Sequence, residues 1–459
     1  MIKKLVLGLL LAGTAGWLLS ACSPKPPASR EDRLKWNLSS LTNAYEMAGH
    51  KDLKWDADVK EAFTEFARAQ VASASEIAVL TGLAGSAAES AVAAGCHDPM
   101  IRYIYARFGT GPNAKPLAER KELYWAAASN LECSAYAPIR KYYANANAAE
   151  LLYTERNSNV WPVVSELRQK AMQNLNAAFQ DPTLPSTDAC QAADHVFQML
   201  ARNGGQLTNA YNLLEGTLAA DKSKAAVAAM VKAEFYSRIA WIARGHGTAN
   251  QVTEEGWRLF RERLAEAEKA LNLAWTKDPY DPQIPTRMLD IVRSQEKSRP
   301  EMEKWFQRAM QLDPNNYQAC QSKLTYLMPQ WYGSAGDMAA FGRECVAHTN
   351  WGGRVPLILV DAHIDCADLL PRQSRDGYWL QPEVWPDVKA SYERFFQTEP
   401  DAMGVRYRYA FFAASCGQWQ DFKEQIALIR QTDGKVDEDY FGGKEALERL
   451  LKNADSPAK

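Results

Sequence analysis

The common catalytic and cofactor-binding motifs are missing from this 459-residue sequence. It has no H-E-x-x-H metalloprotease motif, no G-x-S-x-G nucleophile elbow and no phosphate-binding P-loop. The eight cysteines form no C-x-x-C pair, so neither a thioredoxin-like redox centre nor a zinc ribbon is indicated. We therefore expect no catalytic residues, no metal and no cofactor.

A concentrated basic segment is missing as well. The chain has 53 Lys and Arg residues against 55 Asp and Glu residues, and the two signs are interspersed. Binding to a nucleic-acid backbone depends on clustered Lys and Arg side chains. The charge pattern therefore argues against nucleic acid as a partner.

Runs of alternating apolar and polar residues, which would predict β-strands, are also absent, and helical spacing takes their place. Apolar residues three and four positions apart occupy one face over residues 159–179, which Asp181-Pro182 follow. The same spacing precedes Asp278-Pro279. Because a residue before proline is disfavoured in the helical conformation, both pairs predict helix ends. We predict an all-α chain of short amphipathic helices.

The longest apolar run lies at the N-terminus. Residues 1–21 have the pattern of a secretory signal, with Lys3 and Lys4, an apolar core and then small residues. The core is shorter than the ~20 apolar residues of a membrane-spanning helix. The Leu-Ser-Ala-Cys sequence ending at Cys22 resembles the bacterial lipobox, which implies cleavage before Cys22 and lipidation of that cysteine. Ser23 resembles the outer-membrane sorting pattern.

Four further segments follow the signal. Residues 22–35 are predicted to be a flexible tether, because they include a proline-rich stretch without an apolar pattern. An N-terminal helical region is expected over 36–250 and a second helical region over 251–435. A C-terminal helix with a polar tail is expected over 436–459. A chain of this length predicts two or more domains or one extended helical array.

Small residues and prolines recur in the second helical region. The recurring positions are Ala267, Ala274 and Pro279, then Phe306, Ala309 and Pro314. Farther on, Gly417-Gln418-Trp419 places a glycine before an aromatic residue, as at a turn between helices. These residues resemble the tetratricopeptide (TPR) repeat over about 255–430, which implies helical hairpins stacked into a solenoid with irregular repeats. Phe422 departs from the pattern, because a small residue is normal there.

Two further segments, residues 328–341 (MPQWYGSAGDMAAF) and 95–100 (GCHDPM), resemble the signature of an uncharacterised family of bacterial TPR-like proteins. In the first segment, Ser334 and Asp337 have the spacing of a capping box that begins a helix. The resemblance favours the helical fold and implies no activity.

The cysteines allow two interpretations. If neighbouring helices are antiparallel, Cys96 and Cys133 can lie at the same end of a pair and form a disulfide in an oxidising compartment. The same argument applies to Cys320 and Cys345. Alternatively, the cysteines are small buried side chains of the helical core.

Aromatic residues supply the candidate binding surface. Trp331, Tyr378, Trp379 and Trp385 lie in the TPR-like half, the last three in a proline-interrupted segment. Aromatic side chains are common anchors in recognition surfaces, so we predict that these four bind a partner. Packing at wide helix–helix interfaces is the alternative for each of them.

One group of metal-ligand types occurs over residues 345–366, where Asp361, His363 and Asp365 alternate. Side chains two positions apart on a helix point in different directions, so a polar helix face is expected instead of a metal site. An envelope hydrolase or metal-dependent enzyme using residues 345–366 is nevertheless an alternative function.

Together these patterns predict a lipid-anchored envelope lipoprotein, facing the periplasm from the outer membrane. Its TPR-like helical surface is expected to bind an envelope protein or peptide without catalysis. Contact with the membrane is expected through lipidated Cys22. A self-associating structural component is a further alternative.

Overall fold

Every regular element in the described part of the chain is a helix. The computed structural model describes residues 29–72, 76–109, 117–154, 160–201 and 204–455. These ranges contain no strand, which confirms the all-α prediction. None of their helices has the length and apolar character needed to cross a membrane. Cys22 and the predicted signal lie outside the described residues.

The first half of the chain contains ten α-helices among the described residues. They are α1 (Arg30–Ala48), α2 (Asp56–Ala69), α3 (Ile77–Ala93), α4 (Pro99–Phe108), α5 (Leu117–Glu132), α6 (Pro138–Tyr153), α7 (Trp161–Gln180), α8 (Ser186–Leu200), α9 (Gly204–Ala219) and α10 (Ala225–Arg244). Successive helices pack against one another, most extensively α2 with α3 and α6 with α7.

The described residues of the second half are also helical. The helices are α11 (Glu254–Lys277), α12 (Gln283–Ser294), α13 (Arg299–Leu312), α14 (Tyr317–Tyr326), α15 (Ala335–Ala347), α16 (Ile358–Asp368), α17 (Arg375–Trp379), α18 (Val384–Phe396), α19 (Met403–Ser415), α20 (Trp419–Asp433) and α21 (Lys444–Asp455). Short 3-10 turns lie at Lys222–Lys224, Ala249–Gln251, Val355–Leu357, Arg372–Ser374 and Asp439–Phe441.

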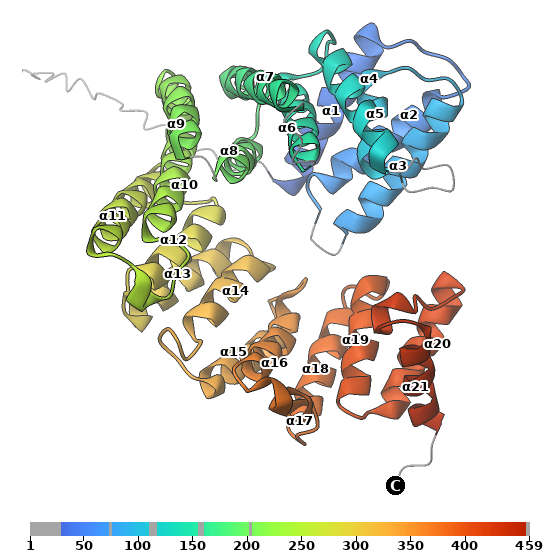
Figure 1. Ribbon diagram of the computed structural model, residues 1–459, viewed down its shortest axis with the longest axis vertical. Helices are drawn as coiled ribbons and strands as arrows, with labels where there is room; N and C mark the ends of the chain where they lie inside the picture. Colours follow the sequence, from blue (N-terminus) through green and yellow to red (C-terminus); the bar gives the residue numbers. More distant parts are fainter. Residues whose placement is uncertain (1–28, 73–75, 110–116, 155–159, 202–203, 456–459) are drawn as a thin grey trace, which may run out of the picture.

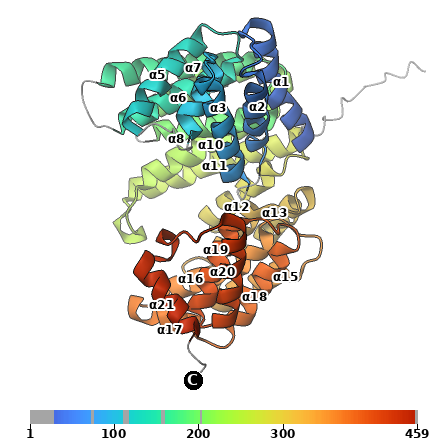
Figure 2. The same cartoon turned by 90° about the vertical axis from the view of Figure 1, so that its right-hand side faces the viewer.

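The helices form a curved row. Figure 1 shows the chain bending from α1 through α11 to α21, so that the first and last helices face each other across the inside of the curve. Figure 2 shows the same row turned by 90°, with the N-terminal half above the C-terminal half. In Figure 1, α8, α14 and α16 border the inside of the curve, whereas α9 and α11 lie outside. Contacts of α8 with α10, α12 with α14, and α14 with α16 connect the inner helices.

The predicted helix ends are found where the sequence places them. Helix α7 ends directly before Asp181, and α11 ends directly before Asp278. Ser334 begins α15, and its Oγ accepts a hydrogen bond from the backbone N–H of Asp337 at 3.1 Å. The turn at Gly417 joins α19 to α20 with a φ of +69°, a conformation that glycine adopts without strain.

The start of the helical body differs from the prediction. Helix α1 begins at Arg30, inside the segment 22–35 predicted to be a tether. Ser29 and Asp32 form a capping box, in which the backbone N–H of each residue donates to the side chain of the other at 3.1 Å. This capping satisfies N–H groups that would otherwise be free, so the helix starts before the predicted end of the tether.

The boundary predicted between residues 250 and 251 does not separate two cores. Helices α10 and α11, on either side of it, make the most extensive helix–helix contact among the described residues. The rings of Trp241 and Phe260 meet there with centroids 4.9 Å apart. One apolar cluster continues from Ile139 on α6 to Cys366 on α16.

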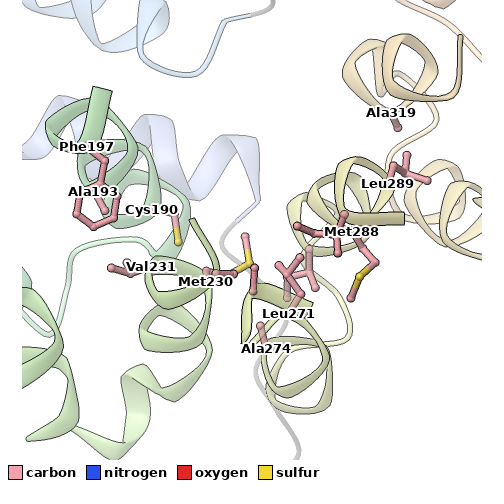
Figure 3. Packing of buried hydrophobic residues seen from close by; sticks show 14 of the residues in the cluster. Cys190, Ala193, Phe197, Met230, Val231, Leu271, Ala274, Met288, Leu289 and Ala319 are labelled. Atoms are coloured by element: carbon pink, nitrogen blue, oxygen red, sulfur yellow. The ribbon is translucent and has the colours of Figure 1, made fainter. Parts of the chain in front are cut away.

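Figure 3 shows part of this cluster, in which Cys190 of α8, Met230 of α10, Leu271 of α11 and Met288 of α12 lie in one layer. These side chains are at most 6% exposed. Burying apolar area contributes about 25 cal/mol per Å², so a layer shared by four helices stabilises them jointly. The two predicted helical regions therefore share one apolar cluster across the predicted boundary, and further separate clusters lie towards each end of the chain.

Gly85 lets α3 pack against the end of α4. A Cβ atom at position 85 would lie 2.1 Å from the backbone oxygen of Phe108. Gly82 lies nearly one turn earlier on α3, and its Cβ position has no neighbouring atom within 4 Å. We expect Gly85→Ala to lower the free energy of unfolding by about 1–3 kcal/mol through overpacking. Gly82→Ala should raise it by about 0.5–1 kcal/mol, because alanine has the higher helix propensity.

Denaturant unfolding of both variants measures this difference, with Gly82→Ala as the matched control. A similar gain in stability for both substitutions would contradict the close approach of α3 to α4.

Candidate functional site

The four aromatic residues predicted to bind a partner do not gather on one surface. Tyr378 and Trp379 lie on α17 and Trp385 lies on α18, and all three pack partly buried against the apolar cluster of α16, α18 and α19. Trp331 lies apart, beyond the end of α14, where the guanidinium of Arg293 covers its ring at 5.4 Å.

These rings have partners inside the protein. Trp379 contacts Phe412 with ring centroids 4.7 Å apart. Trp385 stacks on Tyr409 with centroids 6.0 Å apart and an interplanar angle of 16°. Packing at helix interfaces, the alternative considered from the sequence, therefore describes these residues better than a shared aromatic groove.

His363 connects three helices through a buried polar chain. Its Nδ1 lies 2.8 Å from the hydroxyl of Tyr378, and its Nε2 lies 3.1 Å from a carboxylate oxygen of Asp387. Asp387 also pairs with Arg343 at 2.8 Å. Burial lowers the pKa of His363, so the ring is neutral at pH 7. The neutral imidazole can accept from Tyr378 and donate to Asp387, which fixes α17 and α18 against α16.

The other polar residues of 345–366 face different neighbours. Asp361 pairs with Arg408 at 2.8 Å and accepts a hydrogen bond from Tyr317. His348 stacks on Trp351, with ring centroids 4.1 Å apart. No cluster of three or more His, Cys, Asp or Glu side chains suited to a metal ion occurs in the described ranges. The alternating pattern of residue types therefore does not correspond to a convergent ligand set.

The predicted disulfide between Cys96 and Cys133 is not formed. Both are free thiols, and Cys96 is 1% exposed whereas Cys133 is exposed on the surface. Cys320 and Cys345 are also free and fully buried. Burial, together with a hydrogen bond to Cys320, raises the pKa of Cys345. The buried cysteines act here as small core side chains, the alternative considered from the sequence.

Charged side chains of successive helices pair with one another in two groups, one joining α8, α10 and α12 and the other joining α16 and α19. We call the two groups together the inner charged row; it consists of Asp194, Glu234, Arg238, Arg287, Asp290, Asp361 and Arg408. These residues come from α8, α10, α12, α16 and α19. Helix α14 contacts both groups, because the hydroxyl group of Ser322 donates to Asp290 and that of Tyr317 donates to Asp361.

The centre of the row is a cluster of two carboxylates and two guanidinium groups. Glu234 pairs with Arg238 on its own helix at 2.6 Å and with Arg287 of α12, while Arg238 also pairs with Asp194 of α8. The four side chains are between 16% and 29% exposed. Equal numbers of opposite charges lower the cost of holding ionised groups away from water.

The two carboxyl groups of this cluster differ in acidity. Burial raises the pKa of Glu234 despite the nearby Arg287 and Arg238. Burial also opposes ionisation of Asp194, but Arg287, a hydrogen bond from Glu234 and Arg238 together lower its pKa. As the pH falls, Glu234 therefore takes up a proton before Asp194 does.

A cavity of about 210 Å³ opens beside the cluster. Its lining contains the four cluster residues together with Ser237, Asp290 and Gln318. Gln318 is exposed, and the side chain of Asp290 is 44% exposed. The cavity therefore presents hydrogen-bond donors, acceptors and charges of both signs on the inner surface, without a nucleophile paired to a base.

The sequence alone does not predict this row. Arg238 and Asp194 are 44 positions apart, and Arg287 and Glu234 are 53 positions apart, so only the fold reveals the pairs. The spacing of Glu234 and Arg238, four positions on one helix, was the local signal. That spacing is also common on ordinary exposed helices, so it does not identify a site by itself.

Comparisons with known proteins provide no assignment. No protein-family model matches the chain, and no curated protein matches it significantly. The resemblances to TPR repeats and to an uncharacterised bacterial family therefore stay predictions, and function has to be inferred from residues and geometry.

The carboxyl group of Asp365 is expected to make the stability of the folded protein depend on pH. Burial, with smaller effects from Asp361 and Asp368, raises its pKa from 3.8 to about 6. A raised folded-state pKa means that the contribution of Asp365 to stability is fully present below pH 3.8 and is lost as the pH rises through about 6. Asp365→Asn removes this titration. Its melting temperature, relative to that of the unmodified protein, should therefore be higher at about pH 7.5 than at about pH 4.5.

Calorimetric melting at the two pH values measures this effect. Asp376→Asn, an exposed position on the neighbouring α17, is the control and should show a smaller change. The same pH response in both variants would rule out an effect of burial at Asp365.

Proposed function

We propose that this protein is a lipid-anchored envelope lipoprotein that binds an extended polypeptide along its inner charged row, without catalysis. The observation that carries the proposal is the row itself, in which charged side chains of successive helices pair with one another, within a curved array of helices (Figure 1). Curved helical arrays present extended inner surfaces that suit elongated partners.

The charge pattern supports a polypeptide as the partner. Carboxylates and guanidinium groups alternate in the central cluster of the row, in the order Asp194, Arg238, Glu234 and Arg287. A partner with charges of only one sign would meet repulsion at every second position. An extended polypeptide offers N–H groups, carbonyl groups and side chains of both signs, so each group along it can find a complementary one.

The location is supported by the sequence pattern that ends at Cys22. Two or more acyl chains hold a protein stably on a membrane. A lipid-anchored body of this kind would present its inner surface within the envelope.

Site-specific photocrosslinking in intact cells tests the binding surface. We expect a photoreactive residue at Gln318, which lines the inner cavity, to crosslink one recurrent envelope polypeptide. The matched control is the same residue at Gln307, an exposed position on α13 that should give no such product. Equal crosslinking from both positions would contradict binding along the inner charged row. A crosslink to a second copy of this chain would favour the self-associating alternative.

A charge reversal tests the same surface independently. Asp290→Lys should reduce recovery of the crosslinked partner by about tenfold, because it places like charges beside Arg293 and Arg287. Glu262→Lys reverses an exposed charge on α11, outside the curve, and should leave recovery unchanged. Thermal melting of both purified variants confirms that they are folded before recovery is compared.

Replacing Cys22 tests the anchor. Full-length Cys22→Ala should lose metabolic labelling by an alkyne fatty acid and should leave the membrane fraction. The variant Cys133→Ala, which removes an exposed thiol of the helical body, is the control and should keep both properties. Retained labelling after loss of Cys22 would exclude this residue as the lipid attachment point.

A further inference from the structure

A second polar cavity, of about 180 Å³, lies in the N-terminal half between α2, α3, α4 and α6. Its lining includes two arginines, Arg107 and Arg140, and two tyrosines, Tyr103 and Tyr143, but no Asp or Glu. We call it the arginine pocket. It shares no lining residue with the cavity beside the inner charged row, and the proposed polypeptide-binding function makes no use of it.

Arg140 is buried without a carboxylate partner. It is 3% exposed, and its Nε and Nη2 groups donate to Ser40 and to the side chain and carbonyl of Asn37, all of which are neutral. Burial lowers its pKa to about 10, opposed by Asp188, so the guanidinium stays charged at pH 7. Among the described residues, Nη1 has no hydrogen-bond partner, which leaves one end of the charged fork unused.

Arg107 is the second cation of the pocket. It donates to the hydroxyl oxygen of Tyr103 at 2.9 Å, and the side chain of Asn147 donates to the same oxygen at 2.8 Å. Arg107 forms no ion pair with any described residue. Because two donors occupy the oxygen of Tyr103, its own hydroxyl hydrogen is left to donate elsewhere.

Tyr143 adds a further donor. Its hydroxyl group makes no hydrogen bond with the described residues, and burial raises its pKa, so the proton is retained. The polar lining therefore combines two positive charges with two tyrosine hydroxyl donors. Buried donors and cations without acceptors are costly, and a negatively charged acceptor in the pocket would satisfy them.

Apart from Gln70 and Thr81, the rest of the lining is apolar and defines the rest of the ligand. Phe66, Met100 and Phe108 line the pocket. A phosphate ion has oxygen atoms on every side and would place some of them against these walls without partners. A carboxylate has its two oxygens at one end, which matches the planar donor fork of an arginine.

We propose that the arginine pocket binds a small organic carboxylate whose apolar or aromatic body lies against Phe66, Met100 and Phe108. The cavity is smaller than the ~300–1,000 Å³ pockets that hold drug-sized ligands, so the ligand is a small acid. The carboxylate accepts hydrogen bonds from Arg107 and Arg140, and the tyrosine hydroxyl groups complete its coordination.

Isothermal titration calorimetry of the detergent-purified full-length protein tests the site. The probe is benzoate, with benzyl alcohol as an uncharged analogue of similar shape and inorganic phosphate as a second anion. We expect saturable binding of benzoate, no saturable binding of benzyl alcohol, and binding of phosphate at least about tenfold weaker. Absence of saturable benzoate binding, or tighter binding of phosphate than of benzoate, would overturn the proposal.

Variants assign the binding to the pocket. Arg107→Gln should weaken benzoate binding by about tenfold or more, because it removes a charge-assisted hydrogen bond. Arg68→Gln is the matched control: Arg68 lies on α2, pairs with Glu65 at 2.9 Å, and is outside the pocket lining. It should bind benzoate with unchanged affinity.

A more conservative substitution tests the pocket even if Arg107→Gln does not fold. Tyr143→Phe removes one hydroxyl group, and it should weaken benzoate binding several-fold while keeping the circular dichroism spectrum of the unmodified protein. Unchanged benzoate affinity in a folded Arg107→Gln protein, or in Tyr143→Phe if Arg107→Gln does not fold, would exclude the arginine pocket as the binding site.

Discussion

The packing of α10 against α11 is the interaction on which the rest of the structure depends. It joins the N-terminal and C-terminal halves through one apolar cluster, in which Phe235 of α10 and Phe260 of α11 are both 4% exposed. The side of α10 that is turned to α8 and α12 carries Glu234 and Arg238, which belong to the central cluster of the inner charged row. Because one helix supplies both features, the positions of the charges are fixed by the apolar core behind them.

Charged side chains inside this protein are stabilised in two different ways. In the central cluster of the inner charged row, two carboxylates and two guanidinium groups neutralise each other. In the arginine pocket, Arg107 and Arg140 have only neutral partners. The first arrangement offers charges of both signs, whereas the second offers positive charge alone.

Local features of this fold could be predicted from the sequence, and long-range features could not. Helix ends at Asp181 and Asp278 and the turn at Gly417 were predictable because proline and glycine restrict the backbone within a few residues. The capping residue Ser334 was predictable for the same reason. The partner of Arg287 was not, because it lies 53 positions earlier and no local pattern specifies it. The role of aromatic residues such as Trp379 could not be decided from the sequence, since a large ring serves a core as well as a binding surface.

The attachment of α1 determines how the molecule would respond to mechanical force. Arg33 of α1 pairs with Asp188 of α8 at 2.8 Å, Asn37 donates to the same carboxylate at 3.2 Å, and Trp36 donates to Thr183 at 3.1 Å. Tension applied to α1 would therefore load α8 as well as α2, because α1 contacts both helices.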